Sequence, residues 1–474
     1  MEASTVLNEN TEIRDHFRAS RFENILKCVH CGLCLDNCPT YRELGDEKDS
    51  PRGRLYLMRG LWEGELGLEP EVIAPLDRCL DCRACESSCP SGVPYGELLE
   101  KTRGIILEKR TQSLKERLAR TFLLKGLLRS TLAMVTASQL MRLYRWTGLP
   151  KLLTRSPLKS ILPRQFVFSQ HLLPNFSGRS FKKRYSDRLF RPEGQVSARG
   201  RVGLFTGCIL DVSETDIHEA SIRMLRTAGF EVVVPGDQGC CGALHVHSGD
   251  RTTARSLARH HRKSFMPRKL DAIVTNAAGC GAQLKEIHHL FPEADETEME
   301  SWKDMEARTI DLLELITPES LSQASWCSEE ITVFYDAPCH LMHAQGVDAN
   351  PRQLIDSLPG VKLVTLPESN WCCGSAGIYN LVQPDLAGAV LERKITSIRQ
   401  TLEVYPESKI LLTANPGCLY QIRAGVSQAG LPLQGQLLSA KLWRPLHSLR
   451  PSDLRRLGWQ SDRRPSWRSG LKMH

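Results

Sequence analysis

One cysteine motif occurs twice, 51 residues apart, and this duplication constrains the fold more than any other feature of the sequence. Each copy has the spacing C-x2-C-x2-C-x3-C-P. Three thiolates on a tight turn can each reach one iron of a cubane, whereas the fourth, beside the proline at a helix start, reaches the neighbouring cluster. The motif therefore predicts two [4Fe–4S] clusters with crossed ligands: Cys28, Cys31, Cys34 and Cys89 for one, and Cys79, Cys82, Cys85 and Cys38 for the other.

A pair of zinc sites is the alternative interpretation. Structural zinc sites are usually built from paired C-x2-C knuckles and not from triplets followed by Cys-Pro, so iron–sulfur clusters are favoured. The segment Pro51-Arg52-Gly53-Arg54 lies between the two copies. Cationic groups there would stabilise the reduced form of a nearby cluster and raise its potential. A solvated turn explains the segment equally well.

The composition is that of a soluble protein with two to four domains. The 474 residues are 41% apolar and 24% charged, and near-average Gly and Pro contents exclude collagen-like and wholly disordered chains. We find no run of about 18 uncharged apolar residues and no signal peptide, so we expect a cytoplasmic protein. Thiols stay reduced in the cytosol, and the 17 cysteines are therefore interpreted as ligands, not as disulfides.

Positive charge is concentrated in the middle of the chain and in its tail. Residues 101–200 contain 22 Lys and Arg against 4 Asp and Glu, and residues 441–474 contain 9 against 2. Helical spacing of apolar residues over 114–146 predicts one or two amphipathic helices, and four prolines between residues 150 and 174 predict a loop-like linker. This segment can contact an anionic membrane surface, dock an acidic partner or stay solvated; without a nucleic-acid-binding motif, no nucleic acid is expected. The tail is expected to be weakly ordered.

After residue 200, short β-branched runs alternate with helical patterns. This alternation predicts an α/β architecture with parallel sheets. The expected strands are 202–205, 232–234, 272–274, 331–334, 363–364 and 410–412, and the expected helices are 215–228, 251–264 and 384–401.

A Cys-Cys-Gly (CCG) element with two flanking cysteines occurs twice in this half of the chain. Adjacent side chains point apart in a strand, so both thiols face one centre only in a turn, which the glycine permits. Paired buried cysteines without a cofactor are the alternative, and the leftover Cys327 is expected to be a buried apolar residue. The repeats predict two cofactor-binding sets near strand ends, at the interface of two domains: Cys208, Cys240, Cys241 and Cys280, and Cys339, Cys372, Cys373 and Cys418.

Four histidines follow these cysteines closely: His245 and His247 after the first CCG, and His340 and His343 after Cys339. They are interpreted either as proton carriers beside a redox site or as ordinary hydrogen-bonded residues.

The expected fold class is α+β multidomain, with a helical, ferredoxin-like two-[4Fe–4S] module at the N-terminus and two pseudo-repeated α/β CCG domains. The expected segments are the two-cluster domain 1–100, the basic helical linker 101–200, the first CCG domain 201–328, the second CCG domain 329–440 and the basic tail 441–474.

The two cluster motifs followed by two CCG repeats resemble the iron–sulfur subunits of glycolate oxidase. Lactate utilisation, anaerobic glycerol-3-phosphate dehydrogenase and heterodisulfide reductase B/D proteins are related to them. The resemblance covers roughly residues 20–440 and rests on flanks such as Cys28-Val-His-Cys-Gly, Pro51-Arg-Gly-Arg, Cys89-Pro-Ser-Gly-Val, Cys372-Cys-Gly-Ser-Ala-Gly and Ala414-Asn-Pro-Gly-Cys.

The resemblance implies an electron-transfer subunit of an oxidoreductase complex. An FAD-binding partner subunit would oxidise glycolate, and D-lactate less specifically, and electrons would pass through the two clusters toward a quinone or other membrane acceptor. A peripheral position on the inner face of the cell membrane fits this role. No catalytic residue is assigned to this chain, because it has neither a GxGxxG fingerprint nor a P-loop. The alternatives are a lactate-utilisation or heterodisulfide-reductase-like electron-transfer subunit, and a zinc-stabilised interaction protein.

One departure concerns the end of each CCG repeat. The fullest family pattern ends in C-x2-C, and here the first of those positions are Ala277 and Asn415, which leaves four cysteines per repeat. Four thiolates can still hold an additional cluster, and a quinone-binding or partner-binding role is the alternative.

Overall fold

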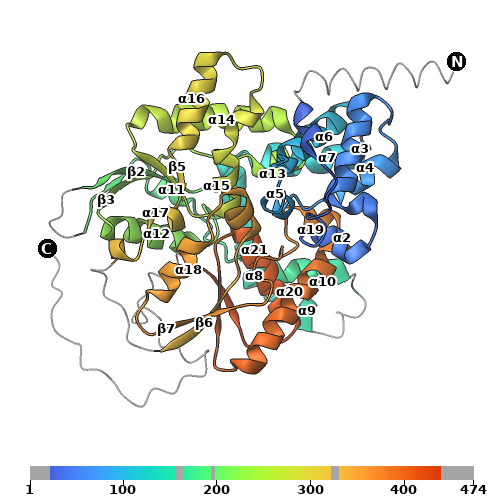
Figure 1. Ribbon diagram of the computed structural model, residues 1–474. Coiled ribbons are helices and arrows are strands. Elements are labelled where there is room, and N and C mark those ends of the chain that lie inside the picture. Colours follow the sequence, from blue (N-terminus) through green and yellow to red (C-terminus); the bar gives the residue numbers. More distant parts are fainter. Residues whose placement is uncertain (1–21, 156–161, 163, 194–197, 322–329, 439–474) are drawn as a thin grey trace, which may run out of the picture.

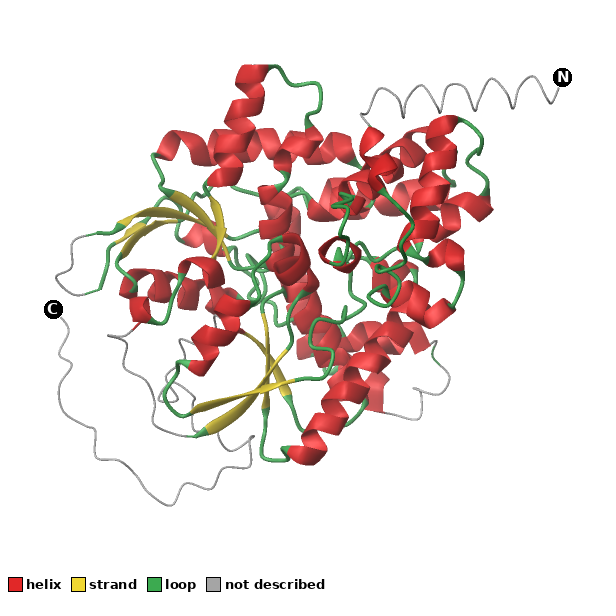
Figure 2. Cartoon of the chain, in the orientation of Figure 1, coloured by secondary structure: helices red, strands yellow, loops and turns green. Residues whose placement is uncertain are grey.

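A helical N-terminal module lies on one side of the molecule, and two domains that each contain a β-sheet lie on the other (Figures 1 and 2). The computed structural model describes residues 22–155, 162, 164–193, 198–321 and 330–438. Cys327 and the basic tail lie outside these residues. None of the helices in the described part is long and apolar enough to cross a membrane.

The N-terminal module is built from short helices around a small apolar core. Leu61, Leu76 and Leu99 are buried at its centre. Proline occupies the first turn of three of its helices, where no backbone donor is needed. The elements are η1 (Glu23–Lys27), α2 (Pro39–Leu44), η2 (Glu47–Asp49), α3 (Pro51–Glu63), α4 (Pro70–Asp77), α5 (Ala84–Ser87) and α6 (Tyr95–Lys109).

The linker is more helical than the sequence predicts. Helices within 114–146 are confirmed, but the expected loop after them is wrong for two segments. Pro150 is the second residue of a helix, a position that tolerates proline, and Arg164 begins another helix directly after Pro163. The elements are α7 (Leu114–Arg120), the π-helical turn η3 (Thr121–Leu127), α8 (Thr131–Trp146), α9 (Leu149–Arg155), α10 (Arg164–His171) and α11 (Phe181–Arg184).

The first sheet has the order β1-β3-β2-β4-β5, and its strands are parallel except for β1, which pairs antiparallel to β3. Its strands are β1 (Leu189–Phe190), β2 (Gly200–Phe205), β3 (Phe230–Val233), β4 (Ala272–Thr275) and β5 (Thr309–Asp311). Its helices are α12 (Thr215–Thr227), α13 (Ala243–His247), α14 (Arg251–Phe265), η5 (Met266–Arg268), α15 (Ala278–Lys285), η6 (Ile287–Leu290), α16 (Glu296–Ala307), α17 (Leu312–Leu315) and η7 (Glu319–Leu321).

The second sheet is entirely parallel, with the order β7-β6-β8-β9. Its strands are β6 (Ile331–Tyr335), β7 (Val361–Thr365), β8 (Ile410–Thr413) and β9 (Gln434–Leu437). Its helices are η8 (His340–Ala344), α18 (Ala349–Asp356), α19 (Tyr379–Val382), α20 (Pro384–Val404) and α21 (Pro416–Gln428). Each strand and helix expected after residue 200 is present, so the prediction of a parallel sheet in each repeat is confirmed.

One apolar core joins the two sheets. Leu204 of β2 is fully buried and packs in the same cluster as Tyr335 of β6 and Leu354 of α18. The outer face of the first sheet is covered by α14 and α16, and the outer face of the second sheet by α20 and α21. Since the inner faces share a core, the two CCG domains form one packed unit.

Candidate metal centres

The two N-terminal cysteine loops follow the same backbone path. His30 and Gly32 of the first loop have positive φ angles of 54° and 86°, and Asp81 and Arg83, 51 positions later, have 51° and 63°. A left-handed residue before and after the second cysteine turns the chain sharply. The sequence repeat is therefore also a repeat of backbone conformation.

Two adjoining cavities collect the cysteines in crossed order. Cys28, Cys31, Cys34 and Cys89 line the first cavity, so the last cysteine of the second motif lies with the first three of the first motif. Cys38, Cys79, Cys82 and Cys85 line the other, and Cys85 also borders the first cavity. Four soft thiol ligands per cavity suit an iron–sulfur cluster. Ligation by these eight residues stays a prediction.

The two cavities differ in exposure. Cys31 of the first set is exposed, and its three companions are half-buried. The four cysteines of the second set are all buried. The first site therefore faces the surface of the N-terminal module, and the second lies inside the molecule.

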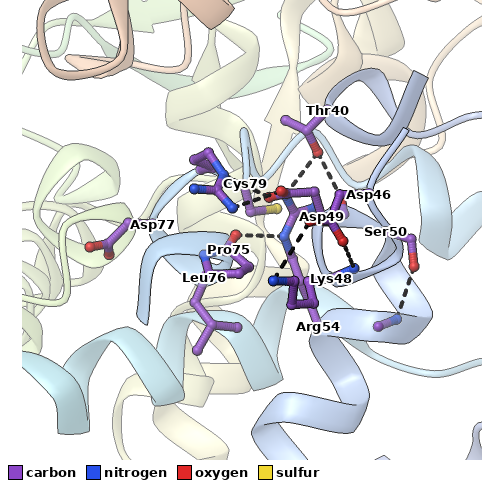
Figure 3. A network of polar contacts seen from close by, with 12 residues as sticks. Thr40, Asp46, Lys48, Asp49, Ser50, Arg54, Pro75, Leu76, Asp77 and Cys79 are labelled. Carbon is purple, nitrogen blue, oxygen red and sulfur yellow. Dashed lines mark hydrogen bonds and ion pairs between the residues drawn. The ribbon is translucent and has the colours of Figure 1, made fainter. Parts of the chain in front are cut away.

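A buried arginine lies beside the second site. Arg54, on the first turn of α3, is 0% exposed and donates to the Pro75 carbonyl at 2.7 Å (Figure 3). The same side chain donates to the Cys38 sulfur at 3.8 Å. It also pairs with Asp49 at 3.1 Å. Burial alone would lower the pKa of this guanidinium, but Cys79 and other anionic neighbours hold the pKa above its ordinary value. Arg54 is therefore a fixed cation beside the cysteines, not part of a solvated turn.

Hydrogen-bond donors also point at the sulfur atoms of the second site. The Tyr95 hydroxyl and the Asp81 backbone N–H each donate to the Cys79 sulfur at 3.4 Å. Burial raises the pKa of the Cys82 and Cys85 thiols well above the ordinary value. Thiolates here therefore need a bound cation as compensation, which an iron–sulfur cluster supplies.

Arg52 has the corresponding place at the first site. Its Nη1 donates to the His30 carbonyl at 3.3 Å, and Glu47 pairs with its Nε at 2.7 Å. Burial raises the pKa of the Cys34 thiol to about 11, although the Arg52 backbone N–H opposes the shift. The segment Pro51–Arg54 thus lies between the two sites, with one arginine directed at each.

Each CCG repeat assembles its own set of four thiols. In the first repeat, side-chain hydrogen bonds link Cys208 to Cys240, Cys240 to Cys241, and Cys241 to Cys280. The second repeat has the same chain of contacts, through Cys339, Cys372, Cys373 and Cys418. None of the described cysteines forms a disulfide.

The CCG glycines have the turn conformation expected from the sequence. Gly242 and Gly374 have φ angles of 96° and 81°, in the left-handed region. This turn lets neighbouring cysteines face one centre. The two glycines therefore explain why the CCG element recurs at these sites.

The second CCG set lies against the N-terminal module. Cys82 is close enough to Cys339 and Cys372 to affect their ionisation, and these three residues share an apolar cluster with Leu80 and Trp371. The first set lies instead beneath the linker, because Cys208 packs with Leu124 and Met134. The two sets thus have different neighbours on their outer sides.

The two repeats do meet at the ends of their motifs. Ala277 and Asn415 occupy equivalent positions, directly before α15 and α21. The Asn415 side chain accepts from the Gly279 backbone N–H at 3.2 Å and donates to the Cys418 sulfur at 3.6 Å. Asn415 therefore contacts a cysteine of its own set from the position that holds a cysteine in the fuller pattern.

The four histidines occupy different environments. His245 is buried and donates to the Leu124 carbonyl at 3.0 Å, and His343 bonds the Ser87 hydroxyl at 2.7 Å. The His340 ring is buried beside Cys339, and burial lowers its pKa to about 3. Burial alone would also lower the pKa of His247, but its hydrogen bond to Asp81 raises this pKa to about 9.

An ionic network that the sequence did not predict joins the N-terminal module to the first CCG domain. Buried Arg83 pairs with Asp81 at 3.0 Å, with Glu100 at 3.1 Å and with Glu286 at 3.2 Å. Arg103 of α6 donates to the Cys79 carbonyl at 2.6 Å and to the His247 carbonyl at 3.1 Å. The one available signal was Arg83 itself, which stands where the first motif has Gly32.

Three family profiles match the chain. The profile of the 4Fe-4S dicluster domain matches residues 24–93, and that of the cysteine-rich CCG domain matches 202–285 and 332–423. The profile of the linker region of glycolate oxidase iron–sulfur subunits matches residues 115–170. These matches cover both pairs of cysteine sites and the helices between them.

Several curated proteins are similar to the chain over much of its length. The probable glycolate oxidase iron–sulfur subunit of Bacillus subtilis is 35% identical over 434 residues, which are 90% of this chain and 95% of that protein. The glycolate oxidase iron–sulfur subunit of Escherichia coli is 32% identical over 412 residues, 86% and 92% of the two chains. Lactate utilization protein A of Geobacillus kaustophilus is 28% identical over 234 residues, 49% and 95% of the two chains.

One family assignment accounts for the repeated cysteine loops, the two CCG domains and the similarity along nearly the whole length. The chain belongs to the family of glycolate oxidase iron–sulfur subunits.

Proposed function

We propose that this chain is the electron-transfer subunit of a complex that oxidises glycolate, and D-lactate less specifically. An FAD-binding partner subunit carries out the substrate oxidation, and a quinone takes up the electrons. The single observation that carries the proposal is the pair of adjoining four-cysteine cavities with crossed membership. [4Fe–4S] clusters, when bound there, supply one-electron transfer.

The exposure of the sites supports a direction of transfer. The first site is open to the surface at Cys31, where a partner subunit has access, and the second is buried behind it. Arg52 and Arg54 place positive charge beside the sites, which favours the arrival of an electron. The residues of this chain thus hold the cofactors, exclude water from the inner one and set the local charge.

We further propose that the second CCG set continues the path. Cys339 and Cys372 lie next to Cys82 of the inner site, and four mutually contacting thiols suit an additional cluster. A buried ion pair between Asp336 and Lys394, at 2.8 Å, fixes the strand end that precedes Cys339. Quinone or partner binding is the alternative role of this region.

The lactate-utilisation alternative has narrower support. The relative of that name aligns with 49% of this chain, whereas the two glycolate oxidase relatives align with 90% and 86%. We therefore place the glycolate oxidase assignment first and keep a lactate-utilisation or heterodisulfide-reductase-like electron-transfer subunit as the alternative.

The test uses the complex isolated anaerobically with its partner subunits. Adding glycolate without another electron donor should reduce both N-terminal sites, as followed by electron paramagnetic resonance, and D-lactate should do so more slowly. Cys82→Ser should remove the signal of the inner site and stop quinone reduction. Metal analysis that finds stoichiometric zinc and almost no iron would disprove the proposal.

A further inference from the structure

The linker helices carry large apolar side chains on their outer faces. Leu118 and Phe122, four residues apart on α7 and η3, are 60% and 73% exposed. Leu132 and Trp146, at the two ends of α8, are 78% and 84% exposed. Residues spaced by multiples of a helical turn share a face. We call this surface the linker face, and its residues are Leu114, Leu118, Phe122, Leu132, Leu140, Leu143 and Trp146.

On both η3 and α8, the linker face is directed away from the protein. Leu124 of η3, Leu128 directly after it and Met134 of α8 are buried in one cluster with Val212 of the first CCG domain. Because η3 and α8 bury their inner sides in the same cluster, their opposite sides both face away from it. Leu118 and Phe122, which belong to the apolar spacing over 114–146, are thus on the outside of the molecule.

The charge around the linker face has one sign. Residues 110–151 contain nine Lys and Arg and a single acidic residue, Glu116. Arg117, Lys125 and Arg129 are exposed there. Lysine is depleted at protein interfaces, whereas a bilayer with anionic lipids offers only negative charge above an apolar interior. Apolar side chains flanked by basic ones are typical of helices that lie in a membrane interface.

We propose that the linker face binds peripherally to a membrane surface that contains anionic lipids. Phe122, Leu132 and Trp146 enter the headgroup region, and the basic residues pair with lipid phosphates. This placement puts η3 and α8 between the bilayer and Cys208, since both helices pack on the loop that carries this cysteine. Lipid binding does not depend on the proposed function. Only the delivery of electrons to a membrane acceptor rests on that function.

The test is co-sedimentation of the full chain, purified anaerobically with its cofactors, with vesicles of defined composition. Vesicles of phosphatidylcholine and phosphatidylglycerol in about a 2:1 ratio should bind the protein, and phosphatidylcholine vesicles should bind it at least about tenfold more weakly. Phe122→Ser and Trp146→Ser should each lower binding to the anionic vesicles about tenfold. Lys125→Gln should lower it about fivefold. The matched control is Val404→Ser, an exposed apolar residue of α20 far outside the linker in sequence, and it should bind as wild type does.

Two outcomes would overturn the proposal. One is wild-type protein that does not bind anionic vesicles, or variants that bind them as wild type does. The other is a loss of association with the FAD-binding subunit in Phe122→Ser and Trp146→Ser, with vesicle binding unchanged, which would make the linker face a protein interface. Retained visible absorbance and iron content in each variant separate both outcomes from misfolding and from failure of the electron-transfer assignment.

Discussion

Replacing Arg54 tests whether its charge sets the reduction potential of the inner site, which is the second site, lined by Cys38, Cys79, Cys82 and Cys85. The guanidinium lies 3.8 Å from the Cys38 sulfur and is fully buried. With an effective dielectric constant of about 20 and a charge separation of about 6 Å, one unit charge contributes on the order of 3 kcal/mol. For one electron this equals on the order of 100 mV, because a tenfold change in equilibrium corresponds to about 59 mV. Arg54→Gln should therefore lower the reduction potential of the inner site by on the order of 100 mV. It should change the potential of the outer site, lined by Cys28, Cys31, Cys34 and Cys89, much less.

The assay is a redox titration followed by electron paramagnetic resonance. Arg54→Lys keeps the charge and should retain most of the wild-type reduction potential of the inner site. Arg59→Gln, at an exposed position of the same helix, should leave both potentials unchanged. Loss of buried Arg54 also costs stability, but Asp49 keeps its partner Arg78 at 2.7 Å, so we expect about 3 kcal/mol, the lower end of the range for a broken buried pair. Equal shifts at both sites, or no shift at either, would refute the reasoning.

Two further predictions concern stability. The pKa of His247 is raised to about 9, so its protonated ring stabilises the fold fully below its unfolded pKa of about 6.5, and this contribution is lost as the pH rises through about 9. In denaturant titrations, His247→Gln should therefore lower the free energy of unfolding by on the order of 3 kcal/mol at about pH 6 and barely change it at about pH 10; an equal effect at both would contradict the assignment. A Cβ on Gly374 would lie 2.6 Å from the Ala387 carbonyl oxygen, against 3.6 Å for the nearest atom to one on Gly242. Gly374→Ala should thus destabilise the protein more than Gly242→Ala, as measured by melting temperature, and the reverse order would argue against the steric account.

The cysteine spacing predicted the crossed grouping of the N-terminal sites because that spacing is a local geometric constraint. A triplet followed by Cys-Pro fixes a tight loop, and both copies of the loop have left-handed residues at the same two positions. The expected helix start is present at Pro39 in the first copy but wrong for the second, where Pro90 lies in a turn and the next helix begins at Tyr95. The parallel sheets were predictable for a similar reason, since alternating strand and helix patterns require crossover connections. The division into five segments stays a prediction, and α6 (Tyr95–Lys109) continues across its expected boundary at residue 100.

The contacts between segments were not predictable from spacing. The position of Cys82 beside Cys339, 257 residues away in sequence, depends on how the N-terminal module docks on the second CCG domain. The Arg83 network likewise joins residues that are far apart in the chain. Helical periodicity at Leu118 and Phe122 identified an amphipathic helix correctly, but periodicity alone does not say which side faces the protein.

The central claim is that each N-terminal motif gives its last cysteine to the other site. The most direct measurement is iron analysis with electron paramagnetic resonance on anaerobically purified wild type, Cys38→Ser and Cys89→Ser. Wild type should contain about eight irons in the N-terminal module. Cys38→Ser should alter the signal of the site formed by Cys79, Cys82 and Cys85, and Cys89→Ser that of the site formed by Cys28, Cys31 and Cys34. The opposite pattern, in which each substitution alters the site of its own motif, would contradict the account.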